Sequence, residues 1–124
     1  MKFKKYFFKK VKSTNNTALK LIKNGKLNGA IISEIQSKGR GQRSNKWISK
    51  KGNLFINIFF EISNKLTLKK ITQLNLSIIK KIILKITKTY VNVKLPNDIL
   101  IKKKKICGIL QEIVFKNNRK FLII

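Results

Sequence analysis

Glycine, arginine and tryptophan come together in one short stretch, from Gln36 to Trp47, and these residue types suit an anionic ligand. Gly39 and Gly41 flank Arg40, and glycine lets backbone N–H groups approach a phosphate closely. The guanidinium group is a planar fork that fits phosphate or carboxylate, and the indole offers a flat face on which a base can stack. We therefore interpret the stretch as a nucleotide or acyl-phosphate loop, with a solvated basic hairpin loop as the alternative.

A second group of residues follows the only proline of the chain. Pro96, Asn97 and Asp98 predict a constrained turn, because proline has no N–H to give to a sheet. Seven residues later, Lys105 begins a predicted strand that contains Gly108. A glycine inside a strand often marks the close approach of a ligand or of another backbone segment.

The net charge of +26 would ordinarily indicate a polyanionic partner, either a nucleic acid or an anionic membrane surface. However, 27 of the 30 basic residues are lysines, and they are spread along the whole chain. We attribute most of this excess to a composition biased toward residues with A/T-rich codons. We expect no specific nucleic-acid partner, and a basic nucleic-acid-binding module stays as an alternative.

Several classes of site are excluded by composition. The chain has no histidine and one cysteine, Cys107, so a Ser-His-Asp triad, a His/Cys metal cluster and an internal disulfide cannot form. The first 12 residues lack the apolar core of a signal peptide, and no apolar run is long enough to span a membrane. We expect a cytoplasmic protein.

Strands and two helices must position these residues. Ser13 or Thr14 is a good N-cap for a helix that ends near Gly25, and the longest helix, residues 68–90, carries an apolar stripe with lysines around it. We expect this stripe to pack in the interior, with an amphipathic membrane-surface helix as the alternative. Predicted strands cover residues 2–12, 29–35, 53–62, 91–94, 99–101, 105–115 and 120–124, and the strand at 53–62 is expected to be central.

Four motifs in this order and spacing resemble the catalytic domain of biotin protein ligases, the biotin–[acetyl-CoA-carboxylase] ligases. They are Ser13-Thr14-Asn15, Gln36 with Gly39-Arg40-Gly41 and Trp47, Pro96-Asn97-Asp98, and Lys105 with Gly108-Ile109. The resemblance implies an α/β fold like that of class II aminoacyl-tRNA synthetases, with a mixed sheet flanked by helices. It also implies that biotin and ATP form biotinyl-5′-AMP, with Mg²⁺, and that a lysine on the biotin carrier domain of acetyl-CoA carboxylase then takes the biotinyl group.

The resemblance also assigns roles to individual residues. Biotin would be hydrogen-bonded by Ser13, Thr14, Asn15 and Gln36, and the loop closing over the adenylate would consist of Gly39, Arg40, Gly41 and Gln42. Trp47 would stack near adenine, and Lys105 would contact the carboxylate and the α-phosphate, with Lys94 nearby. Asp98, one of only four acidic residues, would be the partner of Mg²⁺ or of an ammonium group. Glu112 would orient a neighbour or merely sit at a strand edge. We expect Arg40 and Lys105 to converge on one acyl-phosphate.

Three departures from the family pattern bear on activity. Gln42 stands where the family usually has arginine, a loss that Arg43 next to it can offset, and Leu95 stands in place of a tryptophan. The third departure concerns the extent of the match. We expect residues 1–124 to form one incomplete catalytic domain that stops before the family's G-x-G-x-N segment, without an N-terminal DNA-binding domain or a C-terminal barrel. A lipoate-type ligase and a non-catalytic remnant are the related alternatives, and the oligomeric state is left open.

Overall fold

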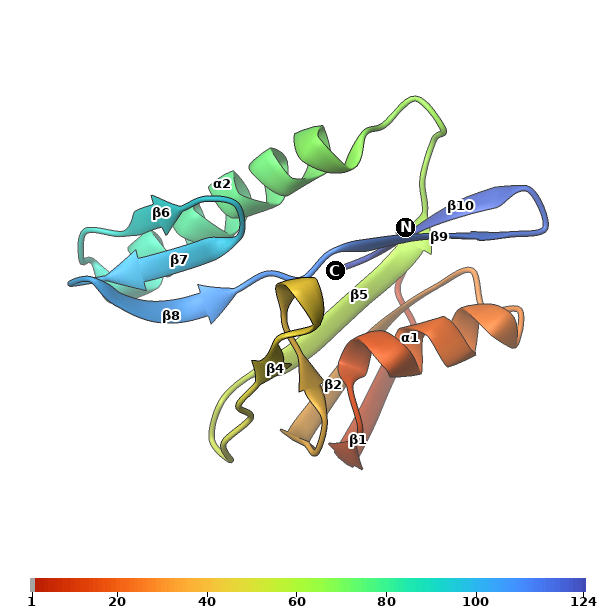
Figure 1. Cartoon of the computed structure of the whole chain (residues 1–124), viewed down its shortest axis with the longest axis horizontal. Helices are drawn as coiled ribbons and strands as arrows, with labels where there is room; N and C mark the ends of the chain where they lie inside the picture. Colours follow the sequence, from red (N-terminus) through yellow and green to blue (C-terminus); the bar gives the residue numbers. More distant parts are fainter. Residues whose placement is uncertain (1) are drawn as a thin grey trace. The chain divides into compact units, whose positions relative to one another are not determined.

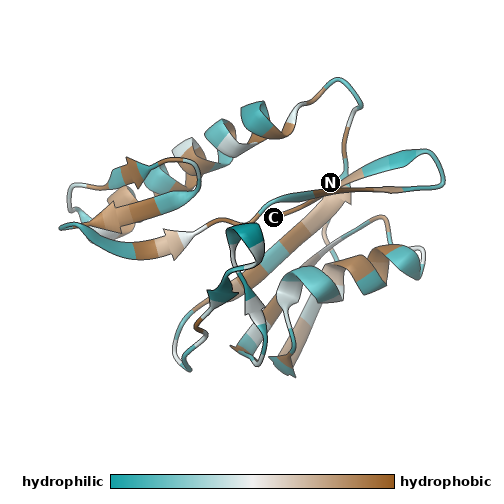
Figure 2. Ribbon diagram, viewed as in Figure 1, coloured by the Kyte–Doolittle hydropathy of each residue, from teal (hydrophilic) through white to brown (hydrophobic). Residues whose placement is uncertain are grey.

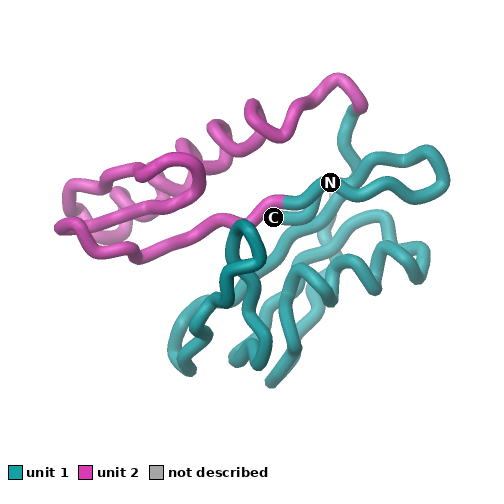
Figure 3. The backbone as a smooth tube through the Cα atoms, in the orientation of Figure 1, with its two compact units in different colours: residues 1–63, 112–124 teal, residues 64–111 magenta. Residues whose placement is uncertain are grey.

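The computed structural model describes residues 2–124, which divide into two compact units (Figure 3). Unit 1 comprises Met1–Ser63 and Glu112–Ile124, and unit 2 comprises Asn64–Gln111. Each unit has its own main sheet and one α-helix, and each is described by itself.

Unit 1 is built on a five-stranded mixed sheet with the order β1-β2-β5-β10-β9 (Figure 1). Strand β1 runs parallel to β2, and the remaining neighbours are antiparallel. The predicted central strand is confirmed, because β5 pairs with β2 on one side and β10 on the other. The strands are β1 (Lys5–Val11), β2 (Asn28–Gln36), β5 (Phe55–Glu61), β9 (Glu112–Lys116) and β10 (Arg119–Ile123).

Helix α1 (Thr14–Lys23) lies along one face of this sheet and closes the core of unit 1 (Figure 1). Ala18 and Ile22 are four positions apart, so both point to the same side of the helix and are buried. The core cluster consists of these two residues with Ile31, Phe59, Phe121 and Ile123 from the sheet. The predicted caps are confirmed, because Ser13 is the N-cap and Gly25 follows the helix with a φ of +82°.

Unit 2 contains helix α2 (Leu68–Thr87) and a three-stranded antiparallel sheet with the order β6-β7-β8. The strands are β6 (Asn92–Lys94), β7 (Asp98–Ile101) and β8 (Lys104–Gly108). Thr67 caps the start of α2. The helix ends at Thr87, three residues before the predicted end, and Lys88 follows it in the left-handed region with a φ of 51°. The turn predicted at Pro96, Asn97 and Asp98 lies at residues 95–97 and connects β6 to β7, and Asp98 is already the first residue of β7.

The expectation that the whole apolar stripe of α2 is buried was wrong. Ile71 and Leu76 are buried, whereas Leu74, Ile78 and Ile86 are exposed. A helix of 20 residues is about 30 Å long, and strands of 3 and 4 residues are too short to cover it. Figure 2 shows hydrophilic and hydrophobic residues intermixed along α2, and within residues 2–124 no helix combines the length and hydrophobicity needed to cross a membrane.

Two further expectations need correction. The strand predicted over residues 105–115 is two strands, β8 in the sheet of unit 2 and β9 in the sheet of unit 1. The break follows Gly108, where the N–H of Ile109 donates to the carbonyl of Asn97 at 2.9 Å and leaves the ladder of β8. The Gly-Arg-Gly stretch, for which a loop was predicted with a basic hairpin loop as the alternative, contains a small hairpin of β3 (Gly39–Arg40) and β4 (Lys46–Trp47).

Candidate functional site

Three consecutive polar residues at the start of α1 are buried, which is unusual for such side chains. Ser13, Thr14 and Asn15 are at most 7% exposed. The Ser13 hydroxyl oxygen accepts the N–H of Asn16 at 3.4 Å, so it caps the helix as predicted. Buried polar groups need hydrogen-bond partners, and the partners of Thr14 and Asn15 come from strands far away in the sequence.

Gln36, the last residue of β2, is the hydrogen-bond partner of Thr14. Its Oε1 accepts the backbone N–H of Thr14 at 2.8 Å and the Thr14 hydroxyl at 3.1 Å. The parallel register of the sheet explains this contact, because Val11, two residues before Ser13, is opposite Gln36. The Nε2 of Gln36 donates to Ser49 Oγ at 3.2 Å. The amide of Gln36 therefore joins the start of α1 to the segment after β4.

The β3–β4 hairpin needs a glycine at its first position. A Cβ on Gly39 would lie 2.6 Å from both the Ser49 hydroxyl and the Trp47 carbonyl, which is closer than atoms can pack. A Cβ on Gly41 would lie 3.4 Å from the Asn45 carbonyl, an ordinary contact. The two glycines thus differ: the backbone packing requires Gly39, whereas the space around Gly41 admits a side chain.

Arg40 of this hairpin makes a two-point ion pair with Glu112, the first residue of β9. The distances are 2.5 Å from Nη2 to Oε1 and 3.2 Å from Nη1 to Oε2, and Nη1 also donates to Asn16 Oδ1 at 2.7 Å. The Glu112 side chain is 25% exposed and that of Arg40 is 38% exposed. The pairing is partly shielded from water, which favours the charge-assisted bonds.

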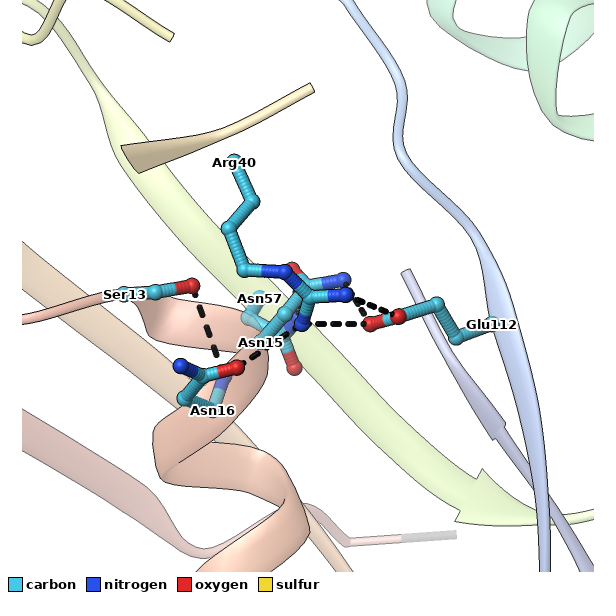
Figure 4. A network of polar contacts seen from close by, with 6 residues as sticks. All are labelled: Ser13, Asn15, Asn16, Arg40, Asn57 and Glu112. Atoms are coloured by element: carbon cyan, nitrogen blue, oxygen red, sulfur yellow. Dashed lines mark hydrogen bonds and ion pairs between the residues drawn. The ribbon is translucent and has the colours of Figure 1, made fainter. Parts of the chain in front are cut away.

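Asn15 extends the same network into the interior of unit 1 (Figure 4). Its Nδ2 donates to Glu112 Oε2 at 2.9 Å, and its Oδ1 accepts from Nδ2 of Asn57 at 2.9 Å. Asn57 lies on β5 and is fully buried. Side chains from α1, β3, β5 and β9 are therefore connected by hydrogen bonds and one ion pair.

In unit 2, an ion pair joins two of the predicted residues. Lys105 Nζ lies 2.8 Å from Asp98 Oδ1, across the β7–β8 pair. Asp98 is also opposite Lys94 on β6 and Gly108 on β8. The four predicted residues of this part of the chain thus lie together in one small sheet.

Cys107 lies in the same sheet and has an altered acidity. Burial raises the pKa of its thiol above the ordinary value, and the nearby Asp98 carboxylate raises it further, while Lys105 acts in the opposite direction. The thiol therefore stays protonated at neutral pH. This excludes Cys107 as a ready nucleophile.

Comparison with known proteins gives a consistent result. A profile of the family described as "Biotin/lipoate A/B protein ligase family" matches residues 7–124. This chain belongs to that family. The bifunctional ligase/repressor BirA of Escherichia coli K12 is 33% identical over 112 residues, which cover 86% of this chain and 34% of BirA. The BirA of Bacillus spizizenii is 32% identical over 114 residues, which cover 88% of this chain and 34% of that protein. The chain thus spans about a third of the length of these curated relatives.

Solved structures of this family share the fold. The biotin protein ligase of Aquifex aeolicus, in complex with biotin and ATP, superposes with a TM-score of 0.78 at 24% identity, over 97% of this chain and 50% of that chain. The biotin acetyl coenzyme A carboxylase synthetase of Helicobacter pylori, with bound biotinylated ATP, gives 0.76 at 24% identity, over 98% of this chain and 59% of that chain. The mixed α/β fold class predicted from the motifs is confirmed.

The predicted site residues of this biotin/lipoate ligase family member fall into two sets. Unit 1 holds the set expected to bind biotin and close over the adenylate: Ser13, Thr14, Asn15, Gln36, Gly39, Arg40, Gly41, Gln42 and Trp47. Unit 2 holds Lys94, Asp98, Lys105 and Gly108. Because Arg40 and Lys105 belong to different units, their convergence on one phosphate stays a prediction.

Some residues that complete these sets were not among the predicted site residues. Ser49 and Asn57 contact the motif residues through side-chain hydrogen bonds and carry no motif of their own. For Glu112 the family resemblance predicts either the orienting of a neighbour or a place at a strand edge, and its position shortly after Gly108-Ile109 was the only signal.

The described residues do not form a metal site by themselves. Residues 2–124 contain no group of three or more His, Cys, Asp or Glu side chains that could hold a metal ion. Asp98, the candidate Mg²⁺ ligand, is paired with an ammonium group. The geometry fits the other expected role of Asp98, as the partner of a cation.

Proposed function

We propose that this chain forms biotinyl-5′-AMP from biotin and ATP and passes the biotinyl group to a lysine of a biotin carrier domain. The observation that carries the proposal is the buried polar start of α1, where Gln36 holds Thr14, Glu112 holds Asn15 and Ser13 caps the helix. The family membership and the resemblance to biotin ligases support it. The carrier domain of acetyl-CoA carboxylase is the proposed acceptor, and the cytoplasm is the proposed compartment.

The ureido ring of biotin has two N–H donors and one carbonyl acceptor, and unit 1 offers groups of the matching types. The Ser13 hydroxyl accepts one bond as the helix cap and retains its hydrogen for donation to a carbonyl. The Thr14 hydroxyl donates to Gln36 and can accept a ligand N–H. The amide of Gln36 is already bonded to Thr14 and Ser49, so we assign Gln36 to positioning Thr14.

In the first step, a carboxylate oxygen of biotin attacks the α-phosphorus of ATP, and pyrophosphate leaves. ATP enters as its Mg²⁺ complex, so the metal arrives with the substrate. Fixed cations stabilise the negative charge that builds up on the transferring phosphoryl group. We propose Arg40 and Lys105 for this role, and Asp98 keeps the Lys105 ammonium group in one place.

In the second step, the neutral amine of the carrier lysine attacks the carbonyl carbon of biotinyl-AMP. An amide bond forms, the bond from that carbon to the phosphate oxygen breaks, and AMP leaves. Adenylation makes this leaving group good enough for attack by an amine. The family also contains lipoate ligases, and an archaeal lipoate protein ligase from Thermoplasma acidophilum superposes with a TM-score of 0.53 at 12% identity, so lipoate is the competing acid.

The test is to incubate the purified chain with biotin and α-labelled ATP and to separate the products by chromatography. Labelled biotinyl-AMP together with pyrophosphate is expected, and addition of a biotin carrier domain should convert it to AMP and a streptavidin-reactive protein. An excess of lipoate should leave the yield unchanged. Failure to form an adenylate from either acid would overturn the proposal, and lipoyl-AMP in preference to biotinyl-AMP would favour the lipoate alternative.

A further inference from the structure

We propose that Glu112 is a positioning residue that fixes both the amide of Asn15 and the guanidinium of Arg40 for adenylate formation. The inference rests on the proposed function, because it assigns these two residues to the biotin and phosphate sides of one reaction. Glu112 is 72 positions from Arg40 and 97 positions from Asn15, and the fold brings all three together in unit 1 (Figure 4).

The placement of Glu112 follows from the sheet. It opens β9 and is opposite Ile123 of β10, which belongs to the core cluster against α1. The Glu112 side chain therefore points to the face of the sheet that α1 covers. On that face its two oxygens meet one N–H of Asn15 and two N–H groups of Arg40.

The carboxylate determines how the Asn15 amide is oriented. A carboxylate only accepts hydrogen bonds, so the end of Asn15 that faces Glu112 must be the NH₂ group. The carbonyl end then faces Nδ2 of Asn57, which donates to it at 2.9 Å. With both neighbours fixed, the Asn15 amide has one orientation. Loss of Glu112 would leave a nearly buried N–H without its partner, so the amide would turn or the helix start would shift.

The same carboxylate leaves one edge of Arg40 open for a second anion. Glu112 takes one hydrogen from each of Nη1 and Nη2, and Asn16 takes the other hydrogen of Nη1. The remaining donors are the Nε–H and the second hydrogen of Nη2, which are parallel and form the side fork of the guanidinium. Within residues 2–124 these two donors have no hydrogen-bond partner. This side fork fits two oxygens of one phosphate.

The charge of Glu112 then has opposite effects on binding and on catalysis. A carboxylate next to Arg40 repels an incoming phosphate, so it weakens the ground-state binding of ATP. It also holds the fork in the geometry that the transition state needs. Removal of Glu112 should therefore lower kcat while the KM for ATP stays constant or falls. A merely structural role would not produce this split, because a loosened fold raises KM as well.

The test compares Glu112→Ala with Glu61→Ala, which removes the other glutamate–arginine pair of the same sheet. Glu61 lies 3.6 Å from Arg119, and both side chains are more than 40% exposed. For Glu112→Ala we expect kcat for biotinyl-AMP formation to fall about 100-fold without a rise in the KM for ATP, and Glu61→Ala should change neither constant more than about twofold. Glu112→Gln keeps the size of the side chain and one acceptor oxygen, and it replaces Glu112→Ala in this comparison if the alanine variant does not fold. It should restore part of kcat.

A readout without turnover separates this inference from the proposed function. Clostripain cleaves after arginine and avoids the 27 lysines of the chain, and the two-point pair protects Arg40 in the free protein. Cleavage after Arg40 should be at least about tenfold faster in Glu112→Ala or Glu112→Gln than in Glu61→Ala. If the unaltered chain makes no adenylate but the cleavage rates differ in this way, the proposed function fails and the fixing of Arg40 stands. Equal cleavage rates, or an active chain in which Glu112→Ala behaves like Glu61→Ala, would overturn the inference.

Discussion

Lys105 Nζ lies 2.8 Å from Asp98 Oδ1, so the proposed catalytic lysine and the candidate metal ligand are partners of each other. The strands explain the pairing. Asp98 opens β7 and Lys105 lies near the start of β8, and the turn at Lys102 and Lys103 folds β8 back along β7. The carboxylate faces the ammonium group, which is the arrangement expected if Asp98 holds Lys105 in place.

The first prediction concerns this pair. Lys105→Ala should abolish biotinyl-AMP formation, because the cation that offsets phosphate charge is removed. Asp98→Asn keeps the shape but removes the negative charge, so the ammonium group loses its fixed position and the rate should fall about 10- to 100-fold. Labelled adenylate formed per minute at saturating biotin and ATP measures both effects.

Lys103→Ala is the matched control for that experiment. Lys103 is an exposed lysine in the adjacent turn and carries the same charge. Its removal should leave the rate within about twofold, because an exposed charge acts through solvent. If Lys103→Ala and Lys105→Ala reduce the rate equally, the lysines of this hairpin act only through their summed positive charge, and Lys105 has no specific role.

The two glycines of the β3–β4 hairpin give the second prediction. Gly39→Ala should destabilise the protein by about 1–3 kcal/mol, because a methyl group would overlap the Ser49 hydroxyl and the Trp47 carbonyl. Gly41→Ala should change the stability by no more than about 0.5 kcal/mol, since Gly41 has an extended backbone with a φ of −109° and room for a Cβ. Urea unfolding followed by circular dichroism compares the two. Equal loss of stability would contradict the packing around Gly39.

The sequence predicted local structure well where a local signal exists. The Ser13 cap, the Gly25 stop and the central strand from Phe55 to Glu61 follow from residue types and periodicity within a few positions, and all are confirmed. At Gly39 a basic hairpin loop was only the alternative interpretation, and its two strands were not predicted because strands of two residues are too short to show alternation.

Features that depend on long-range pairing were harder to predict. The strand expected at residues 105–115 divides between two sheets. The residue types in this segment do not indicate which strand each half pairs with. The partnership of Arg40 with Glu112 depends on β9 lying two strands away from β5, which a pattern of residue types does not encode. The motif residues were therefore found, but the contacts that hold them were not.

The third prediction concerns Lys116, whose ammonium group closes the end of α1. Its Nζ donates to the carbonyls of Ile22 at 2.8 Å and Lys23 at 2.6 Å. These carbonyls belong to the last turn of the helix, where acceptors lack helical partners and a positive charge is favourable. Lys116→Met should destabilise the protein by about 1 kcal/mol. Lys9→Met, at an exposed lysine of β1, is the control and should have little effect on the urea midpoint.

The fourth prediction is a pH dependence that arises from Cys107. Burial and the Asp98 carboxylate raise the pKa of its thiol in the folded protein above the value in the unfolded chain. The contribution of the thiol to stability is therefore fully present below its ordinary pKa and is lost as the pH rises toward its raised pKa, because the unfolded chain ionises first.

Unfolding measured from pH 7 to alkaline pH should show a steeper loss of stability for the unaltered chain than for Cys107→Ala. Lysine and tyrosine titration is common to both proteins, so the difference between them isolates the thiol. In parallel, alkylation of the folded protein by iodoacetamide should be slow at neutral pH and accelerate only above the ordinary range of a free thiol, because the thiolate is the reactive form. A folded thiol that reacts as fast as free cysteine at pH 7 would show that neither burial nor Asp98 protects it.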